Sequence, residues 1–539
     1  MADDKGGAGI DHNELQAQNS PSHIKEGLVL AAEGNDAEHA LGLWASIKKH
    51  PWACFWSIAI STSIIMEGYD IVLISSLFGQ PAFAQRYGEY IESSQSYQIS
   101  AKWQSALSNG TGIGTIIGAF LNGYLTTKFG YKKTLLASLA FMTGAIFIPF
   151  FSPSIEVLLV GQIMCGIPWG VFATSSPSYA SEICPTALRG YLAVYVNLTW
   201  AFGQLVSAGV MSAFSEGTSQ WAYRIPFAIQ WTWPIPIAVM VFLAPESPWY
   251  HVRNGNVEAA KRIVARLQTQ PTPDDLDKTV AMMVHTNELE KQIEEGTSYW
   301  DCFKGVDRRR TEIACMVFAA QPFCGSAMGG TPTYFFLQAG LPVSISFKMS
   351  VGGLALACVG TLISWKLMHS FGRRTLYLWG LGSLSALLCI VGFISVGASH
   401  SKEGNFAQAA MMLLWLFIYY MSVGPICYAI ITEASSTRLR SKSVCLSRIA
   451  YYIAQIISNA VNPFMLNPTA GNWKGKTGFV WGGCAFLFLV WTFFRLPEMK
   501  DRTYEELDVL FAKRTATRAF KKADADPYAS QSYGTRESS

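Results

Sequence analysis

Residues 129–133 read FGYKK, and residues 371–374 repeat this stretch as FGRR in the second half of the chain. A second stretch, PES at residues 245–247, returns as PEM at residues 497–499. Self-similarity at one long spacing indicates that a chain is built from duplicated units. The sequence therefore predicts two halves of one design, with the repeated stretches at corresponding places.

A third repeat consists of a glutamate followed at a fixed spacing by an arginine. Glu182 precedes Arg189 by seven residues, and the pair returns 251 residues later as Glu433 and Arg440. The preference of cytoplasmic loops for positive charge explains the arginines but not the matched glutamates. Opposite charges at one membrane face could hold two halves together while that face is closed. The candidate cytoplasmic gate residues are Lys132, Glu182, Arg189, Glu246, Arg373, Glu433, Arg440 and Glu498.

The composition indicates a membrane protein. Half of the 539 residues are hydrophobic and 14% are charged, against about 25% charged residues in soluble domains. The net charge of +4 gives no reason to expect a nucleic acid as partner. The eleven cysteines and eight histidines lack the spacing of a disulfide framework, a metal site or a catalytic pair. We therefore expect neither an enzyme nor a metal protein.

A glycine-rich stretch at residues 110–114, GTGIG, resembles a phosphate-binding loop. The strand and the lysine that would support such a loop are missing. The stretch lies inside an apolar segment, where small residues let neighbouring helices approach closely. We expect it to serve helix packing.

Apolar segments of the roughly 20 residues needed to cross a bilayer occur twelve times. The chain is therefore predicted to be an all-α polytopic membrane protein, with twelve transmembrane helices in two six-helix repeats. We place the spans at residues 52–79, 103–126, 133–152, 155–181, 191–213, 225–243, 311–337, 343–366, 374–397, 407–432, 443–465 and 478–496.

The distribution of basic residues predicts the orientation. Loops on the side of the termini hold 20 Lys and Arg residues, and loops on the other side hold six. Because basic loops stay inside, both termini are expected in the cytoplasm. The predicted domains are a disordered N-terminal tail (1–50), a six-helix bundle (51–243), a cytoplasmic linker with short helices (244–310), a second six-helix bundle (311–496) and a C-terminal tail (497–539).

Two carboxylates lie inside the first span, at Glu67 and Asp70. Charges at membrane depth are costly and usually mark an ion or substrate pathway. The two residues are three apart and share a helix face, and two close carboxyls in a low dielectric cannot both ionise cheaply. We therefore expect one of them to bind and release a proton; a purely structural buried acid is the alternative.

Together these motifs resemble those of sugar porters of the major facilitator superfamily, most closely the fungal α-glucoside (maltose) permeases. The resemblance covers roughly residues 45–512. It implies the major facilitator fold, with substrate held between the two halves near mid-membrane. Besides FGYKK and FGRR, its marks are PESP (245–248), EGYD (67–70), YASEICP (179–185), YYIAQ (451–455), NP (462–463) and LNP (466–468).

The resemblance implies that Asp70, Glu67 and Arg448 couple protons to transport. For Arg448, near the start of the eleventh span, the alternative is a side chain that reaches the cytoplasmic interface. One position departs from the family pattern. Many proton-linked monosaccharide porters carry an arginine near the start of the fourth span as partner for the first-span acid, and this chain has Gln162 there. A glutamine cannot supply the positive charge, so the acid must be partnered differently.

Sugar sites use amides and aromatic rings. Gln204 and Gln321 match glutamines that contact sugar in the family. Pro322 and Ala327 replace two further amides of the family site, which suggests a roomier pocket suited to a disaccharide. For every candidate, the alternative is a helix–helix hydrogen bond or an interfacial aromatic. The remaining substrate-binding candidates are Tyr428, Tyr451, Tyr452 and Gln455.

The expected function is proton-coupled import of α-glucosides such as maltose across the plasma membrane by alternating access. The expected partners are a sugar and the lipid bilayer, with protons as coupling ion, no other cofactor and a monomeric protein. The alternatives are a symporter or facilitator for another sugar or a polyol, and a sugar sensor that does not transport.

Overall fold

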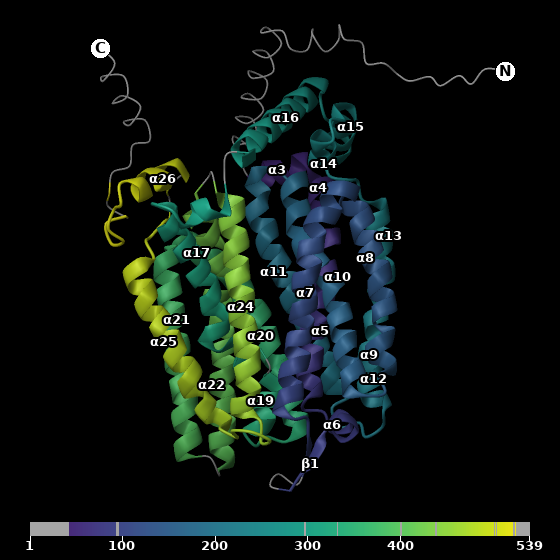
Figure 1. The fold of residues 1–539 in the computed structure, drawn as a ribbon, viewed down its shortest axis with the longest axis vertical. Coiled ribbons are helices and arrows are strands. Elements are labelled where there is room, and N and C mark those ends of the chain that lie inside the picture. The colour runs from purple at the N-terminus through teal and green to yellow at the C-terminus, as the bar shows by residue number, and fades with distance from the viewer. Residues whose placement is uncertain are drawn as a thin grey trace, which may run out of the picture.

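The computed structural model describes residues 43–520, apart from residues 93–95, 296–297, 331, 399–400, 437–438, 501 and 503, together with residue 523. Within these residues, twelve long helical units lie side by side in two groups of six (Figure 1). The predicted all-α architecture is confirmed. Most of the two predicted tails, including residues 1–42, lies outside the described residues.

The first group of six units occupies residues 51–243. Three of its units are divided into shorter helices, and proline in the first turn begins α4 and α13, where its fixed φ suits a helix start. The units are α4 (Pro51–Ser61) with α5 (Ser63–Leu77), α7 (Ala101–Phe129), α8 (Tyr131–Ala145) with α9 (Phe147–Phe151), α10 (Ile155–Ile183), α11 (Thr186–Ala213), and α12 (Trp221–Ile229) with α13 (Pro234–Leu243).

The second group occupies residues 307–495. Its first unit bends at a π-helical turn, Pro322–Ser326, in which Gly325 has a φ of 101° that residues with a Cβ rarely adopt. The units are α17 (Asp307–Gln321) with α18 (Ala327–Gly329) and α19 (Pro332–Gln338), α20 (Val343–Ser370), α21 (Arg373–Gly397), α22 (Lys402–Met421) with α23 (Val423–Ala434), α24 (Arg440–Leu466) and α25 (Thr477–Arg495).

Two of the twelve units are more polar than the rest. In the described part of the chain, nine helices are long and apolar enough to cross a membrane, and the bent unit of α17 to α19 makes a tenth. The other two units are α7 and α11, which pack across the junction of the halves against α24 and α20 respectively. A helix that faces a polar junction can carry fewer apolar residues than one surrounded by lipid.

Short helices gather at one end of the bundle, which we call the linker end (Figure 1). They include α3, which lies inside the segment predicted to be a disordered tail, and α26, which lies inside the predicted C-terminal tail. The elements at this end are α3 (Leu43–Lys49), α14 (Pro248–Arg253), α15 (Val257–Leu267), α16 (Pro273–Glu295), a 3₁₀ turn (Tyr299–Phe303) and α26 (Tyr504–Ala512).

The opposite end, which we call the hairpin end, carries the two β-strands found among the described residues (Figure 1). The strands β1 (Glu89–Ile91) and β2 (Ser96–Gln98) are antiparallel and follow the short helix α6 (Pro81–Tyr87). A 3₁₀ turn, Lys474–Lys476, precedes α25.

Helices α7 and α10 are held close by glycine. A Cβ at Gly118 would fall inside the van der Waals radius of the carbonyl oxygen of Ile167, and one at Gly114 would clash with Ile163 in the same way. On α10, Gly166 and Gly170 stand equally close to the backbone of α7. The structure confirms that the glycine-rich stretch serves helix packing.

The C-terminal helix α26 is tied to the linker end of the second half. The guanidinium of Arg310, which is 3% exposed, pairs with Asp508 and donates to the carbonyls of Ala434 (2.7 Å) and Ser435 (3.1 Å). It also lies 4.7 Å from the ring centre of Phe511. Since a buried charge needs compensation, α26 completes this end of the bundle.

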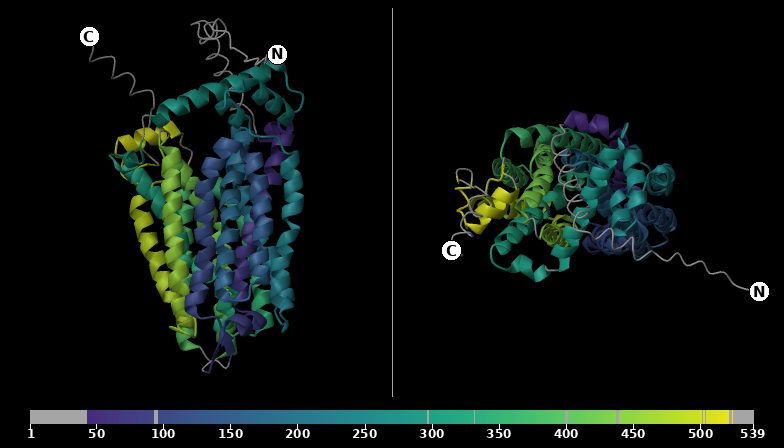
Figure 2. Two further views of the ribbon diagram at one scale, coloured as in Figure 1. Left: turned by 45° about the vertical axis from the view of Figure 1, so that its right-hand side comes forward. Right: turned by 90° about the horizontal axis from the view of Figure 1, so that it is seen from above.

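Hydrogen bonds join the two halves at the hairpin end. The side-chain amide of Asn467, which is fully buried, donates to the carbonyl of Ile99 at 2.7 Å. The backbone N–H of Ala101 donates to the hydroxyl of Thr469 at 3.1 Å. The LNP motif at residues 466–468 therefore helps to join the two halves at this end. Figure 2 shows the two groups of helices side by side from two further directions.

Replacing Asn467 by alanine should loosen this closure. The carbonyl of Ile99 keeps a second hydrogen bond of 3.2 Å, from the side-chain amide of Gln104, so the loss costs about 0.5–1.5 kcal/mol. The population open at the hairpin end should therefore rise roughly 2- to 13-fold. The rate at which an external thiol reagent labels a cysteine at Ser108, which lines a small cavity behind the contact, measures the change. The exposed Lys476, replaced by alanine in the same loop, is the control; equal labelling in both backgrounds would count against the closure.

Candidate functional site

Asp70 lies past the midpoint of the first span, on α5, and is 1% exposed. Its Oδ1 accepts a hydrogen bond of 2.8 Å from the side-chain Nε2 of Gln230. Gln230 begins the 3₁₀ turn, Gln230–Thr232, that divides α12 from α13 in the sixth span. The buried acid is therefore held by a neutral amide on a broken helix.

The neighbouring residue ties α5 to the same broken helix. The hydroxyl of Tyr69 donates to the carbonyl of Pro226 at 2.8 Å. Pro226 lies within α12 and Pro234 starts α13. Pro234 lacks the N–H that would continue the helical hydrogen bonds, which favours the break. At the 3₁₀ turn the backbone N–H of Gln230 bonds to the carbonyl of Phe227 instead of that of Pro226, so the Pro226 carbonyl is available to Tyr69.

Glu67 has different surroundings from Asp70. It is half-buried, and its charge is attracted by that of Arg448 on α24, in the opposite half. The guanidinium of Arg448 bonds to the hydroxyl of Tyr428 and is surrounded by aromatic rings rather than extended toward the linker end. The ring centres within 6.0 Å are those of Phe318, Tyr428, Tyr451 and Tyr452.

The two acids that the sequence places on one face therefore divide their roles. Asp70 contacts the sixth span of its own half, whereas Glu67 faces the cation of the other half. Tyr428 is 40% exposed although it lies at the junction of the halves. The aromatic cluster around Arg448 therefore faces Glu67 of the first half and is not fully enclosed.

Gln162, which occupies the place of an arginine in related porters, is fully buried on α10. Its Oε1 accepts a hydrogen bond of 3.0 Å from the hydroxyl of Thr111. Within the described part of the chain, its Nε2 has no hydrogen-bond partner. The residue links α10 to α7 and brings no charge toward Asp70.

The two glutamines expected to contact sugar lie at helix junctions. Gln204 on α11 accepts a hydrogen bond of 2.8 Å from the hydroxyl of Tyr420, across the two halves. Gln321 at the end of α17 donates to the carbonyl of Gly424 at 2.9 Å. Both glutamines are less than 5% exposed, so a sugar must displace these bonds to reach them. Gln455 on α24 is half-buried.

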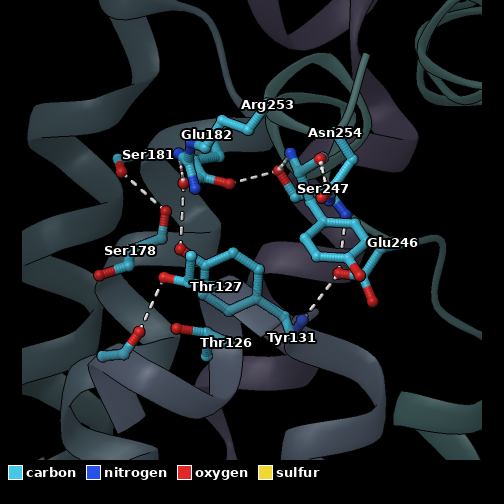
Figure 3. Close-up of polar contacts among 12 residues, drawn as sticks. Thr126, Thr127, Tyr131, Ser178, Ser181, Glu182, Glu246, Ser247, Arg253 and Asn254 are labelled. Atoms are coloured by element: carbon cyan, nitrogen blue, oxygen red, sulfur yellow. Dashed lines mark hydrogen bonds and ion pairs between the residues drawn. The ribbon is translucent and has the colours of Figure 1, made fainter. Parts of the chain in front are cut away.

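At the linker end, Glu182 is the centre of a polar cluster within the first half (Figure 3). Its carboxylate pairs with Arg253 of α14 and accepts hydrogen bonds from the hydroxyls of Ser247 and Tyr131. The side chain of Arg189, its expected counterpart, lies outside the described residues. The cluster joins the fourth span to the start of the linker.

Glu246 caps α8 in the same region (Figure 3). Its carboxylate accepts from the first backbone N–H groups of the helix, including that of Lys132 at 3.1 Å. The approach requires a glycine at Gly130, where φ is 83° and a Cβ would meet the carboxylate. Gly372 stands against Glu498 in the same way, so the repeated motifs make matching contacts in both halves.

The second half has its own ion pair. Arg373 donates to Glu433 at 2.9 Å, and both residues belong to that half. The side chain of Arg440 lies outside the described residues. The described ion pair between gate residues thus lies within one half, whereas the hydrogen bonds made by Asn467 and Ala101 join the halves at the hairpin end.

Sequence reasoning missed Gln230 and Tyr420. Gln230 is an amide inside a span, flanked by prolines, and this is the signal that could have drawn attention to it. Its partner lies 160 residues away, and no spacing rule connects the two. Tyr420 carries still less signal, because aromatic residues are common throughout the spans.

The sequence is similar to those of known sugar transporters. The family model for sugar (and other) transporters matches residues 55–511. A maltose permease of Saccharomyces cerevisiae is 36% identical over 519 residues, covering 94% of this chain and 84% of the permease. A general alpha-glucoside permease of the same yeast is 36% identical over 504 residues, covering 92% of this chain and 81% of the relative.

Solved structures show the same fold. The xylose transporter XylE of E. coli in an inward-open conformation superposes with a TM-score of 0.64 at 20% identity, covering 85% of this chain and 99% of that one. The partially occluded inward-open form gives a TM-score of 0.65 at 18% identity, with coverages of 83% and 100%.

Proposed function

Because this chain belongs to the sugar transporter family, as a major facilitator sugar porter of the maltose permease type, we propose that it imports α-glucosides such as maltose together with protons. The protein is a multi-pass membrane sugar transporter and not an enzyme. The proposal adds the substrate class, the coupling ion, the plasma membrane as location and cytoplasmic termini.

The observation that carries the coupling is the position of Asp70. The carboxyl is 1% exposed, lies inside the first span and is hydrogen-bonded to a neutral amide. A carboxyl in such surroundings can lose its charge by taking up a proton, because burial disfavours the ionised form. Proton binding and release there would tie the sugar cycle to the proton gradient.

The arrangement of the halves supports alternating access. The halves are hydrogen-bonded at the hairpin end, while Tyr428 near their junction remains exposed. We infer that the space between the halves opens toward the linker end. We place the linker end in the cytoplasm, because the basic loops lie there. The described conformation would then be the one that releases sugar into the cell.

The substrate class rests on the relatives and on the pocket. The two yeast relatives are permeases for maltose and for alpha-glucosides. Gln204 and Gln321 supply amides, and Pro322 and Ala327 leave the pocket less crowded than a second glutamine and an asparagine would. A larger pocket suits two linked glucose rings.

Expression in yeast cells that lack their own maltose uptake tests the proposal. Entry of labelled maltose accompanied by alkalinisation of the medium is the expected result. Maltose entry without alkalinisation would indicate a facilitator, which the neutral Gln162 makes the second candidate. Binding without entry would indicate a sensor, and either result would overturn symport.

Replacing Gln321 by alanine should weaken sugar binding. A lost hydrogen bond to a neutral hydroxyl costs about 0.5–1.5 kcal/mol, so the maltose concentration for half-maximal uptake should rise roughly 2- to 13-fold. The maximal rate at saturating maltose should change less. Gln80, a buried glutamine near the hairpin end, serves as the matched control when it is replaced by alanine. An unaltered half-saturating concentration would contradict direct contact.

A further inference from the structure

We propose that Gln230 is a positioning residue for Asp70 that holds the carboxyl in one place whether it carries a proton or not. The inference rests on the proposed proton coupling and adds a residue to it. Gln230 is 3% exposed, and its Nε2 lies 2.8 Å from Oδ1 of Asp70. The pair joins the first span to the break in the sixth.

The remaining side-chain oxygens of Asp70 and Gln230 also fit this role. Oδ2 of Asp70 and Oε1 of Gln230 are buried, and within the described residues neither has a hydrogen-bond partner. Unpaired buried polar atoms are costly and call for an explanation. A carboxyl and a primary amide can form two hydrogen bonds side by side, provided that the carboxyl carries a proton.

The amide therefore suits both states of the acid. When Asp70 is ionised, the N–H of Gln230 donates to Oδ1, as the structure records. When Asp70 is protonated, its new O–H can donate from Oδ2 to Oε1 of Gln230, and both unpaired atoms become satisfied. The added proton comes from the solvent that the transporter faces and is released to solvent on the other side, so no other reactant is needed.

A positive partner would act differently. An arginine beside an aspartate favours the ionised form strongly and forms no comparable pair with the protonated acid. Among titratable groups, Tyr69 of its own helix and Cys165 of α10 interact electrostatically with Asp70. Glu67 lies one helical turn away and faces Arg448. Gln162 of α10 is neutral. Gln230 is therefore the hydrogen-bond partner that can stabilise both the ionised and the protonated carboxyl of Asp70.

Two substitutions should shift the pH dependence of uptake in opposite directions. Gln230→Arg should stabilise the ionised acid and move the external pH of half-maximal uptake down by about 1–3 units. Gln230→Leu leaves both forms of the acid without this partner. An unpaired buried charge costs more than an unpaired neutral acid, so that pH should move up, by about one unit or less. A merely structural role would lower the amount of folded protein without opposite shifts. Gln80→Leu, which removes another buried amide from the same half, should leave the pH profile unchanged.

Different results would contradict the role of Gln230 and the proposed proton coupling. Wild-type protein that takes up maltose without alkalinisation contradicts both. Alkalinisation by the wild type, combined with unshifted profiles in both variants, contradicts the role of Gln230 alone. If the variants do not fold, infrared difference spectra of the purified wild type and of Asp70→Asn decide the matter. The carboxyl band of Asp70 and a glutamine amide band should titrate together, and a carboxyl band that titrates alone overturns the proposal.

Discussion

Replacing Asp70 by asparagine should abolish accumulation of maltose against its gradient while sparing exchange of maltose across the membrane. Asparagine keeps the shape of the side chain and its acceptor for Gln230 but cannot bind a proton reversibly. A proton that crosses 100 mV supplies about 2.3 kcal/mol, enough for roughly 50-fold accumulation of sugar. Without this supply the internal and external concentrations should become equal.

The measurement is the steady-state ratio of labelled maltose inside and outside energised cells, together with counterflow in cells without a proton gradient. Asp301→Asn serves as the matched control, because Asp301 lies outside the bundle, in the 3₁₀ turn that precedes α17. Persistent accumulation by Asp70→Asn would contradict its coupling role. Loss of counterflow as well would show that the substitution damages sugar movement itself.

Replacing Gly118 by leucine should prevent correct folding of the first half. The first atom of the new side chain would occupy the place of the carbonyl oxygen of Ile167, so α7 and α10 must separate. Overpacking a well-filled contact costs about 1–3 kcal/mol and occasionally more. Because the obstacle is backbone, which cannot rotate away, we expect the upper part of that range or beyond.

The same helix supplies a control. A Cβ at Gly123 or at Gly112 meets nothing within 4 Å, so leucine at either position should leave the amount of folded protein nearly unchanged. Thermal unfolding of detergent-purified protein and the fraction that reaches the cell surface report the difference. A Gly118→Leu variant as stable as Gly123→Leu would show that the two helices are not held as the structure describes.

The long apolar segments predict the fold because crossing a bilayer imposes length and hydrophobicity directly on the sequence. The same reasoning is less direct for α7 and α11, whose polar residues face the junction of the halves. Their place could be read from the repeat and from the twelve-span pattern rather than from hydrophobicity. The family resemblance supplied what periodicity could not, namely the expectation that Gln204, Gln321 and Arg448 take part in transport.

The sequence could not predict which residue of another helix each buried polar side chain contacts. Glu67 and Asp70 are three residues apart, yet one faces Arg448 and the other Gln230, because a small rotation around a helix is enough to change the neighbouring span. Likewise, Glu182 pairs with Arg253, a linker residue that no repeat singled out. Spacing predicts which residues share a face, and only the packed structure says what that face meets.

The contacts of Arg310 with Asp508 and Phe511 of α26 limit how hybrid transporters can be assembled from two relatives. A hybrid transporter that takes its second bundle from one relative and its final residues from another would leave this guanidinium facing a foreign Asp508 or Phe511 equivalent. Stranding a buried charge costs about 3–5 kcal/mol. The transplantable unit therefore extends past the last membrane helix, to the end of α26 at least.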